Sequence, residues 1–123
     1  MITVLTRQYQ FRALHHLGRE AHHCHTVHGH NYFLQVSVQG IPHPQSGLLF
    51  RREDLDHLVH TLIIDPWDRQ NLNDVTASKT SGEALASEIF TRLHVALGAQ
   101  LVKVAVQETR KNRFVATAPS RVT

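Results

Sequence analysis

The chain contains only one cysteine, Cys24, among its 123 residues, so no internal disulfide bond can form. This cysteine is therefore either a small buried apolar side chain or a working thiol. The sequence also lacks any apolar run near the roughly 20 residues that a helix needs to span a membrane. Its N-terminus has no charged segment followed by an apolar stretch and a small-residue cleavage site. We therefore expect a cytoplasmic protein without a membrane partner.

Aromatic residues make up only 7% of the chain and are not interleaved with basic residues, which argues against a nucleic-acid-binding module. The net charge of +3 and the pI near 9.5 suggest an anionic partner, and charge alone fits a phosphate-bearing small molecule as well as nucleic acid. A solvated basic face is the more frequent explanation of such basic clusters, here Arg51-Arg52 and Arg110-Lys111-Arg113. Internal repeats, low-complexity segments and linkers are absent, so 14.0 kDa predicts one domain.

The most specific motif is a thiol followed by two closely spaced histidines. If residues 27–38 form a strand, His28 and His30 project from the same face, with the small Gly29 between them. His15, at the end of an earlier strand-like run, offers a third imidazole. Three neutral imidazoles with an open fourth position are typical of a catalytic zinc site. A chance His-x-His pair is the alternative, because the chain holds 11 histidines.

Two further side chains have unusual surroundings. Cys24 lies among histidines that favour the thiolate, namely His22, His23, His25 and His28. Glu108 continues the apolar row of an expected strand, where a carboxylate is unfavourable unless it is paired or hydrogen-bonded. Glu108 is therefore a site candidate, and a strand-end ion pair with Arg110 or Lys111 is the alternative.

Residue alternation and β-branched content predict four strands. The first two cover residues 2–13 and 27–38, and the second of them stops at Gly40-Ile41-Pro42. The other two cover residues 101–109 and 113–118.

Two helices are expected between the second and third strands. Apolar residues at helical spacing over residues 55–63 predict the first helix, with Pro66 as its terminator. Thr80 with Glu83 three residues later forms a capping-box pattern at the start of the second helix. Gly98 suits the position just beyond its end.

Two hairpins separated by two helices predict a single α+β domain over residues 1–118. Its antiparallel four-stranded sheet would follow the order ββααββ and carry both helices on one face. Residues 119–123 are expected to be a mobile tail. The other face of the sheet is too mixed for a conventional core, with Phe33, Gln35, Ser37 and Gln39. We therefore expect identical subunits to close this face and the sheet edges.

Six short motifs follow one another along nearly the whole chain: FRALH at residues 11–15, Cys24 with HGH at 28–30, PQSG at 44–47, Asp68 with NLN at 71–73, SGE at 81–83 and ET at 108–109. In this combination they resemble the motifs of the 6-pyruvoyl-tetrahydropterin synthase family, which includes the bacterial 6-carboxytetrahydropterin synthases of queuosine biosynthesis. The position of the cysteine is that of the bacterial branch. The resemblance implies a tunnelling fold, in which trimers close a barrel, two trimers commonly stack as a hexamer, and active sites lie between subunits.

The resemblance also implies a zinc centre. His15, His28 and His30 would hold Zn²⁺, which would bind the side-chain oxygens of a 7,8-dihydropterin and acidify the adjacent C–H bond. The Cys24 thiolate would be the general base, and Asp68 would take part in a second proton transfer.

The resemblance further implies that the last motif, ET at residues 108–109, recognises the pterin. The Glu108 carboxylate, with Thr109 beside it, would bind the ring N–H and the exocyclic amine.

The chain departs from the family at Arg69, where the family has a histidine that handles the second proton with Asp68. Arginine cannot release a proton at working pH. Either a histidine from the His22, His23, His25 group or from another subunit substitutes, or Arg69 binds an anionic group. Arg51-Arg52 replaces the family's Asp-Phe, and Leu14 replaces its second alanine.

Two function classes stay open. One is a zinc-dependent carbon–oxygen or carbon–carbon lyase acting on 7,8-dihydroneopterin triphosphate or a related dihydropterin, in queuosine, tetrahydropterin or folate biosynthesis. The other is a paralogue that binds zinc and a pterin or purine-like ligand without turnover.

Overall fold

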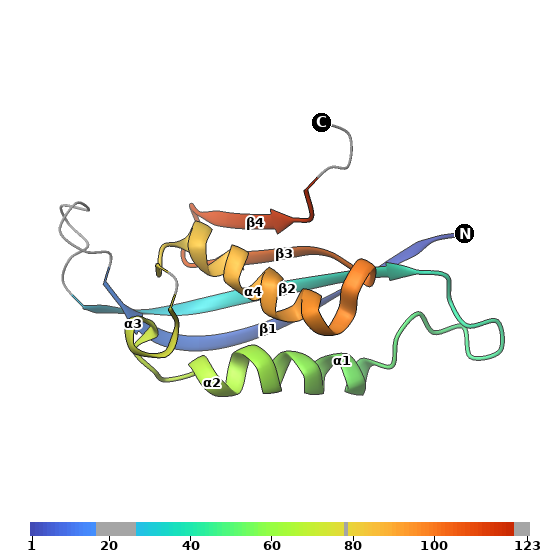
Figure 1. Ribbon diagram of the computed structural model, residues 1–123, viewed down its shortest axis with the longest axis horizontal. Helices are drawn as coiled ribbons and strands as arrows, with labels where there is room; N and C mark the ends of the chain where they lie inside the picture. Colours follow the sequence, from blue (N-terminus) through green and yellow to red (C-terminus); the bar gives the residue numbers. More distant parts are fainter. Residues whose placement is uncertain (17–26, 78, 120–123) are drawn as a thin grey trace.

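The computed structural model describes residues 1–16, 27–77 and 79–119, and its elements follow the expected order of two strands, helices and two strands (Figure 1). The strands are β1 (Thr3–His15), β2 (His28–Gly40), β3 (Leu101–Gln107) and β4 (Arg113–Thr117). They form an antiparallel sheet in the order β1-β2-β3-β4, which confirms the predicted architecture. The mobile tail was predicted over residues 119–123. Of these, residues 120–123 lie outside the described residues.

The first hairpin is the longest feature of the sheet. β1 and β2 pair along their whole length, from Thr3 opposite Gly40 to His15 opposite His28. Side chains alternate along both strands, so one parity faces the core and the other faces away, although Ser37 on the second parity is also buried and shares a hydrogen bond with Thr6. The pairing of β2 with β3 shifts register between Ser37 and Val38, where β3 carries an extra residue.

The first helical segment runs without a break through α1 (Arg52–Val59), the π-helical turn η1 (His60–Ile64) and α2 (Asp65–Trp67). Pro66 was expected to terminate the helix, but the helix ends one residue later. Proline lacks the N–H that would bond to the carbonyl four residues back, at Leu62. Arg92 Nη1 donates to that carbonyl instead, over 3.4 Å.

The remaining helices are α3 (Leu72–Val75), which the sequence patterns missed, α4 (Gly82–Leu97) and the 3₁₀ turn η2 (Gly98–Gln100). Gly98 has a φ of 58°, which confirms the predicted helix end. The predicted N-cap was wrong, because Ser81 caps α4 and accepts the Ala84 N–H over 3.2 Å.

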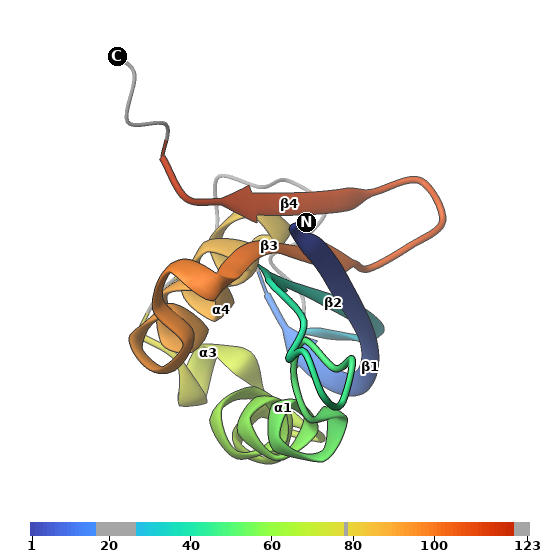
Figure 2. The same cartoon turned by 90° about the vertical axis from the view of Figure 1, so that its right-hand side faces the viewer.

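All the helices lie on one side of the sheet (Figure 2), as predicted. The buried core lies between the two layers, and its largest members include Trp67, Tyr32, Leu34, Leu55 and Ile63. The opposite face carries no helix in the described residues and leaves Phe33 47% and Val115 53% exposed. None of the described helices has the length and apolar character that crossing a membrane requires.

Candidate metal centre

Three histidines converge at the end of the first hairpin, as the motif predicted. His15 lies opposite His28 across the strands, and Ala13 lies opposite His30, so all three side chains are on the core face. One ring nitrogen from each lies within 4.8 Å of the other two. The ring centroids are 4.5 Å apart for His15 and His28, 5.0 Å for His15 and His30, and 4.7 Å for His28 and His30.

His15 is the most constrained of the three and is only 1% exposed. Its Nδ1 donates a hydrogen bond to the main-chain carbonyl of Thr80 over 2.9 Å. A carbonyl only accepts, so Nδ1 carries the proton and Nε2 keeps its lone pair. Nε2 is buried and has no hydrogen-bond partner among the described residues. A bound metal ion would satisfy this buried atom.

The surroundings of His15 and His30 favour neutral imidazoles, the form that ligates metal ions. Burial is the largest influence on the pKa of His15 and lowers it, the hydrogen bond to Thr80 raises it, and the neighbouring histidines lower it further. The pKa of His30 is also lowered, by burial first and then by His28. The three residues therefore fit a divalent cation such as Zn²⁺.

Glu108 directly follows β3 and lies half-buried near the histidines. Phe33 pairs with Gln107, so the next rung brings Glu108 beside Tyr32 on the core face. Burial raises the pKa of Glu108, the His28 ring lowers it, and the Glu83 carboxylate raises it. In the described part of the chain no ion pair joins Glu108 to the basic residues of the following turn, so the salt-bridge alternative gains no support.

Tyr32 packs against the cluster of three histidines. Its ring stacks on Phe11 at 5.0 Å and meets the rings of His15 and His30 edge-on at 6.1 and 5.7 Å. Burial, and then the charge of Glu108, raise the pKa of its phenol. The hydroxyl is buried and has no partner within the described ranges. Sequence reasoning treated Tyr32 only as a core residue.

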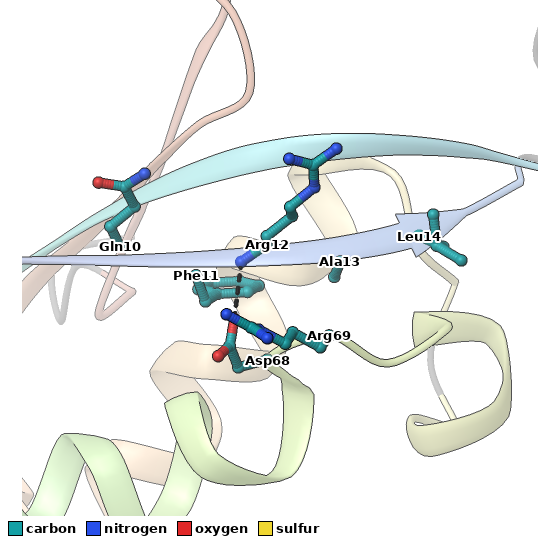
Figure 3. A pocket seen from close by; sticks show the side chains of 7 residues that line it. All are labelled: Gln10, Phe11, Arg12, Ala13, Leu14, Asp68 and Arg69. Carbon is teal, nitrogen blue, oxygen red and sulfur yellow. Dashed lines mark hydrogen bonds between the residues drawn. The ribbon is translucent and has the colours of Figure 1, made fainter.

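Asp68 and Arg69 lie elsewhere in this chain. They line a cavity of about 630 Å³ along the edge of β1, together with residues 10–14 (Figure 3). Asp68 Oδ1 accepts the main-chain N–H of Arg12 over 2.9 Å, and Arg69 adopts a left-handed φ of 62°. Both residues bond to the main chain of Arg12, and Asp68 does not belong to the cluster of three histidines found in the described residues.

The other predicted site residues have different outcomes. Cys24 lies outside the described residues. Thr109 is exposed, and its hydroxyl accepts the Lys111 N–H over 3.3 Å. Sequence reasoning missed Thr80, which it had assigned to a helix cap. The main-chain carbonyl of Thr80 accepts the hydrogen bond from His15. A main-chain contact of this kind leaves no pattern of side chains in the sequence.

Comparisons with known proteins agree on one family. The family model described as 6-pyruvoyl tetrahydropterin synthase matches residues 4–119. A 6-pyruvoyl tetrahydrobiopterin synthase of Dictyostelium discoideum is 33% identical over 96 residues, which cover 75% of this chain and 71% of that protein. A protein of Caenorhabditis elegans described as a putative 6-pyruvoyl tetrahydrobiopterin synthase is 34% identical over 93 residues. These residues cover 71% of this chain and 66% of the Caenorhabditis elegans protein.

The solved structures extend this similarity to the fold. The structure of Caenorhabditis elegans 6-pyruvoyl tetrahydropterin synthase superimposes with a TM-score of 0.88 at 26% identity and covers 97% of both chains. The Plasmodium vivax 6-pyruvoyltetrahydropterin synthase superimposes with a TM-score of 0.75 at 15% identity, over 94% of this chain and 97% of that one, and shares the fold.

Proposed function

The chain belongs to the 6-pyruvoyl tetrahydropterin synthase family, and from this membership we propose that it is a zinc-dependent lyase acting on 7,8-dihydroneopterin triphosphate or a related dihydropterin. The observation that carries the proposal is the convergence of His15, His28 and His30, with the buried Nε2 of His15 lacking a hydrogen-bond partner within the described ranges. Three imidazoles would leave a fourth position for substrate. When bound, the zinc ion would supply Lewis-acid polarisation of the substrate's side-chain oxygens.

Glu108 would orient the pterin. Its half-buried carboxylate lies close enough to His28 for that ring to lower the pKa of Glu108, so a pterin ring held by Glu108 would present its side chain toward the three histidines. A carboxylate can accept the ring N–H and the exocyclic amine together, which fixes the plane of the ring. Burial of the carboxylate strengthens these bonds, because water competes less for them.

Cys24 would take the proton from the substrate carbon as a thiolate. This role rests on the family pattern of a cysteine four residues before HGH. The histidines on either side of Cys24 in the sequence favour the thiolate form.

Asp68 would act at the site of a neighbouring copy. It lies in the cavity at the outer edge of β1 and not beside the histidines of its own chain. β1 and β4 are the outer strands of the described sheet, so β4 and the part of β1 before Arg12 offer main-chain groups to further strands, while the end of β1 already pairs with residues 69–71. We propose that copies join through these edges as trimers, or dimers of trimers, and that the β1 cavity of one copy faces the metal centre of another.

The second candidate function is binding of zinc and a pterin-like ligand without turnover. Arg69 favours it, because arginine stands beside Asp68 where the family has a proton-transferring histidine. If the chain is active, Arg69 would instead bind an anionic group of the substrate, such as a phosphate.

Metal analysis and a turnover assay test the proposal. Purified protein should hold about one zinc per subunit and convert 7,8-dihydroneopterin triphosphate under reducing conditions, with the product identified by mass spectrometry. The Cys24→Ala variant serves as the control and should keep its zinc but lose turnover. A zinc-loaded parent protein that converts no dihydropterin would leave the binding function in place of the lyase.

A further inference from the structure

The segment after α2 runs parallel to the end of β1 and pairs with it rung by rung. Arg69 N–H donates to the Arg12 carbonyl, and Leu14 N–H donates to the Gln70 carbonyl over 2.9 Å. Leu14 also forms a parallel bridge with Asn71. These rungs fix the main chain on the N-terminal side of His15.

The next rung, at His16, is made by a side chain. Asn71 caps α3 by accepting the Asn73 N–H, so the main chain turns away from β1 at this point. The Asn73 amide takes over the pairing: Oδ1 accepts the His16 N–H over 2.9 Å, and Nδ2 donates to the His16 carbonyl over 3.1 Å. This two-point contact has the donor and acceptor pattern of a strand, and it fixes the main chain on the C-terminal side of His15.

Thr80 lies beside Asn73 and contacts both His15 and His16. Its hydroxyl donates to the His16 carbonyl over 3.0 Å, and its own carbonyl accepts His15 Nδ1 over 2.9 Å. Thr80 is 2% exposed, so water does not compete for either bond. Thr80 therefore bonds both to the imidazole of His15 and to the main chain of the next residue, His16.

We propose that Thr80 and Asn73 are positioning residues for the metal centre, acting through His15. Thr80 selects the tautomer of His15 and the direction of Nε2, while Asn73 and the Thr80 hydroxyl together hold the main chain at His16. The inference rests on the proposed metal site. Loss of a group that orients a histidine ligand typically weakens metal binding about 10- to 100-fold.

The test compares variants that differ by single groups at Thr80. Thr80→Val removes the hydroxyl and keeps the size and the main-chain carbonyl, and Thr80→Ser restores the hydroxyl. Thr91→Val is the matched control, because the Thr91 hydroxyl donates to the Ser87 carbonyl within α4, on the exposed side of the helix. The dissociation constant of Zn²⁺ is measured by competition with a chromophoric chelator, and the visible spectrum of the Co²⁺-substituted protein reports the ligand geometry.

We expect Thr80→Val to bind Zn²⁺ about 10- to 100-fold more weakly than the parent and to shift the Co²⁺ spectrum, with Thr80→Ser and Thr91→Val close to the parent. Parent-like affinity and spectrum in Thr80→Val would overturn the inference. Equal weakening in Thr80→Ser would also overturn it, because the hydroxyl would then not be the cause.

Asn73→Asp provides an independent measurement if Thr80→Val does not fold. It keeps the Oδ1 acceptor and loses the Nδ2 donor, so weaker Zn²⁺ binding is again expected, and parent-like binding would overturn the role of Asn73. A parent protein that binds neither Zn²⁺ nor Co²⁺ would overturn the proposed function and this inference together, whereas unchanged affinity in the variants overturns the inference alone.

Discussion

At the scale of single residues, the three histidines proposed as ligands differ in exposure, but each would contribute one nitrogen to the ion. His15 is buried, while His28 and His30 are half-buried. We expect His28→Ala and His30→Ala each to lose the roughly one zinc per subunit of the parent, since two imidazoles hold the ion poorly. Elemental analysis of purified protein measures this. His57→Ala, at an exposed position on α1, is the control and should keep its zinc. Full occupancy in both site variants would show that the ligand assignment is wrong.

Glu108 is the residue whose charge would matter for the ligand and not for the metal. Glu108→Gln keeps the size of the side chain but replaces one acceptor oxygen with an amide donor. We expect pterin affinity to fall about 10- to 100-fold, because hydrogen bonds to a charged group contribute about 1.5–3 kcal/mol. Calorimetry with a dihydropterin measures the affinity, and zinc content should stay at the parent level. Unchanged affinity would contradict the binding role.

Tyr32 and Tyr9 offer a matched pair of phenols. The Tyr32 hydroxyl is buried without a partner in the described part of the chain, whereas the Tyr9 hydroxyl donates to Asp56 over 2.7 Å. Removing an unsatisfied buried group is neutral or stabilising, and removing a hydrogen-bonded one lowers the free energy of unfolding by about 1 kcal/mol. Denaturant unfolding of the metal-free proteins should therefore rank Tyr32→Phe above Tyr9→Phe in stability. The reverse order would mean that the Tyr32 hydroxyl has a partner.

At the scale of elements, the first residue of α4 packs so closely against β4 that no side chain fits at this position. Gly82 lies in the first turn of α4, and a Cβ atom there would sit 2.1 Å from two ring carbons of Phe114. Glycine to alanine normally stabilises a helix by about 1 kcal/mol. Here we expect Gly82→Ala to destabilise the protein by about 1–3 kcal/mol, because the Phe114 ring must move. Thermal unfolding measures the effect, with Ser87→Ala on the exposed side of α4 as the control. A Tm at or above that of the parent would contradict the packing argument.

The strands were predictable because period-two alternation extends over many residues. Glu108 was predicted as a site residue because it places a carboxylate in the apolar row of the third predicted strand. The short helix α3 and the π-helical turn were missed, since neither is long enough to show a hydrophobic period. The Thr80 cap was wrong because Ser81 follows it directly, and either residue can cap a helix. The cavity with Asp68 and Arg69 depends on how that segment pairs with β1, which no local pattern encodes.

At the scale of the whole molecule, the separation of Asp68 from the histidines matters for assembly. If each proposed site takes its histidines from one copy and Asp68 from another, two inactive variants can complement one another. We expect co-expressed His28→Ala and Asp68→Asn chains to recover up to about a quarter of the parent turnover, because about a quarter of all sites in randomly mixed oligomers carries neither substitution.

The control for complementation is co-expression of His28→Ala with His30→Ala. Both substitutions fall on the same half of the site, so every mixed site stays defective. Failure of the first pair to regain turnover, in oligomers shown to contain both chains, would place Asp68 and the histidines in the same subunit or Asp68 outside the reaction.

The pairing of His15 with His28 links ion binding to the way the chain begins to fold. A slip of one residue between β1 and β2 would turn His28 and His30 to the helix-free face. A slip of two residues would move them about 7 Å along the strand relative to His15. An ion held by all three side chains therefore stabilises only the correctly paired hairpin. Since the three histidines lie within residues 15–30, this contribution of the ion would depend on one local hairpin and not on the helices that cover it.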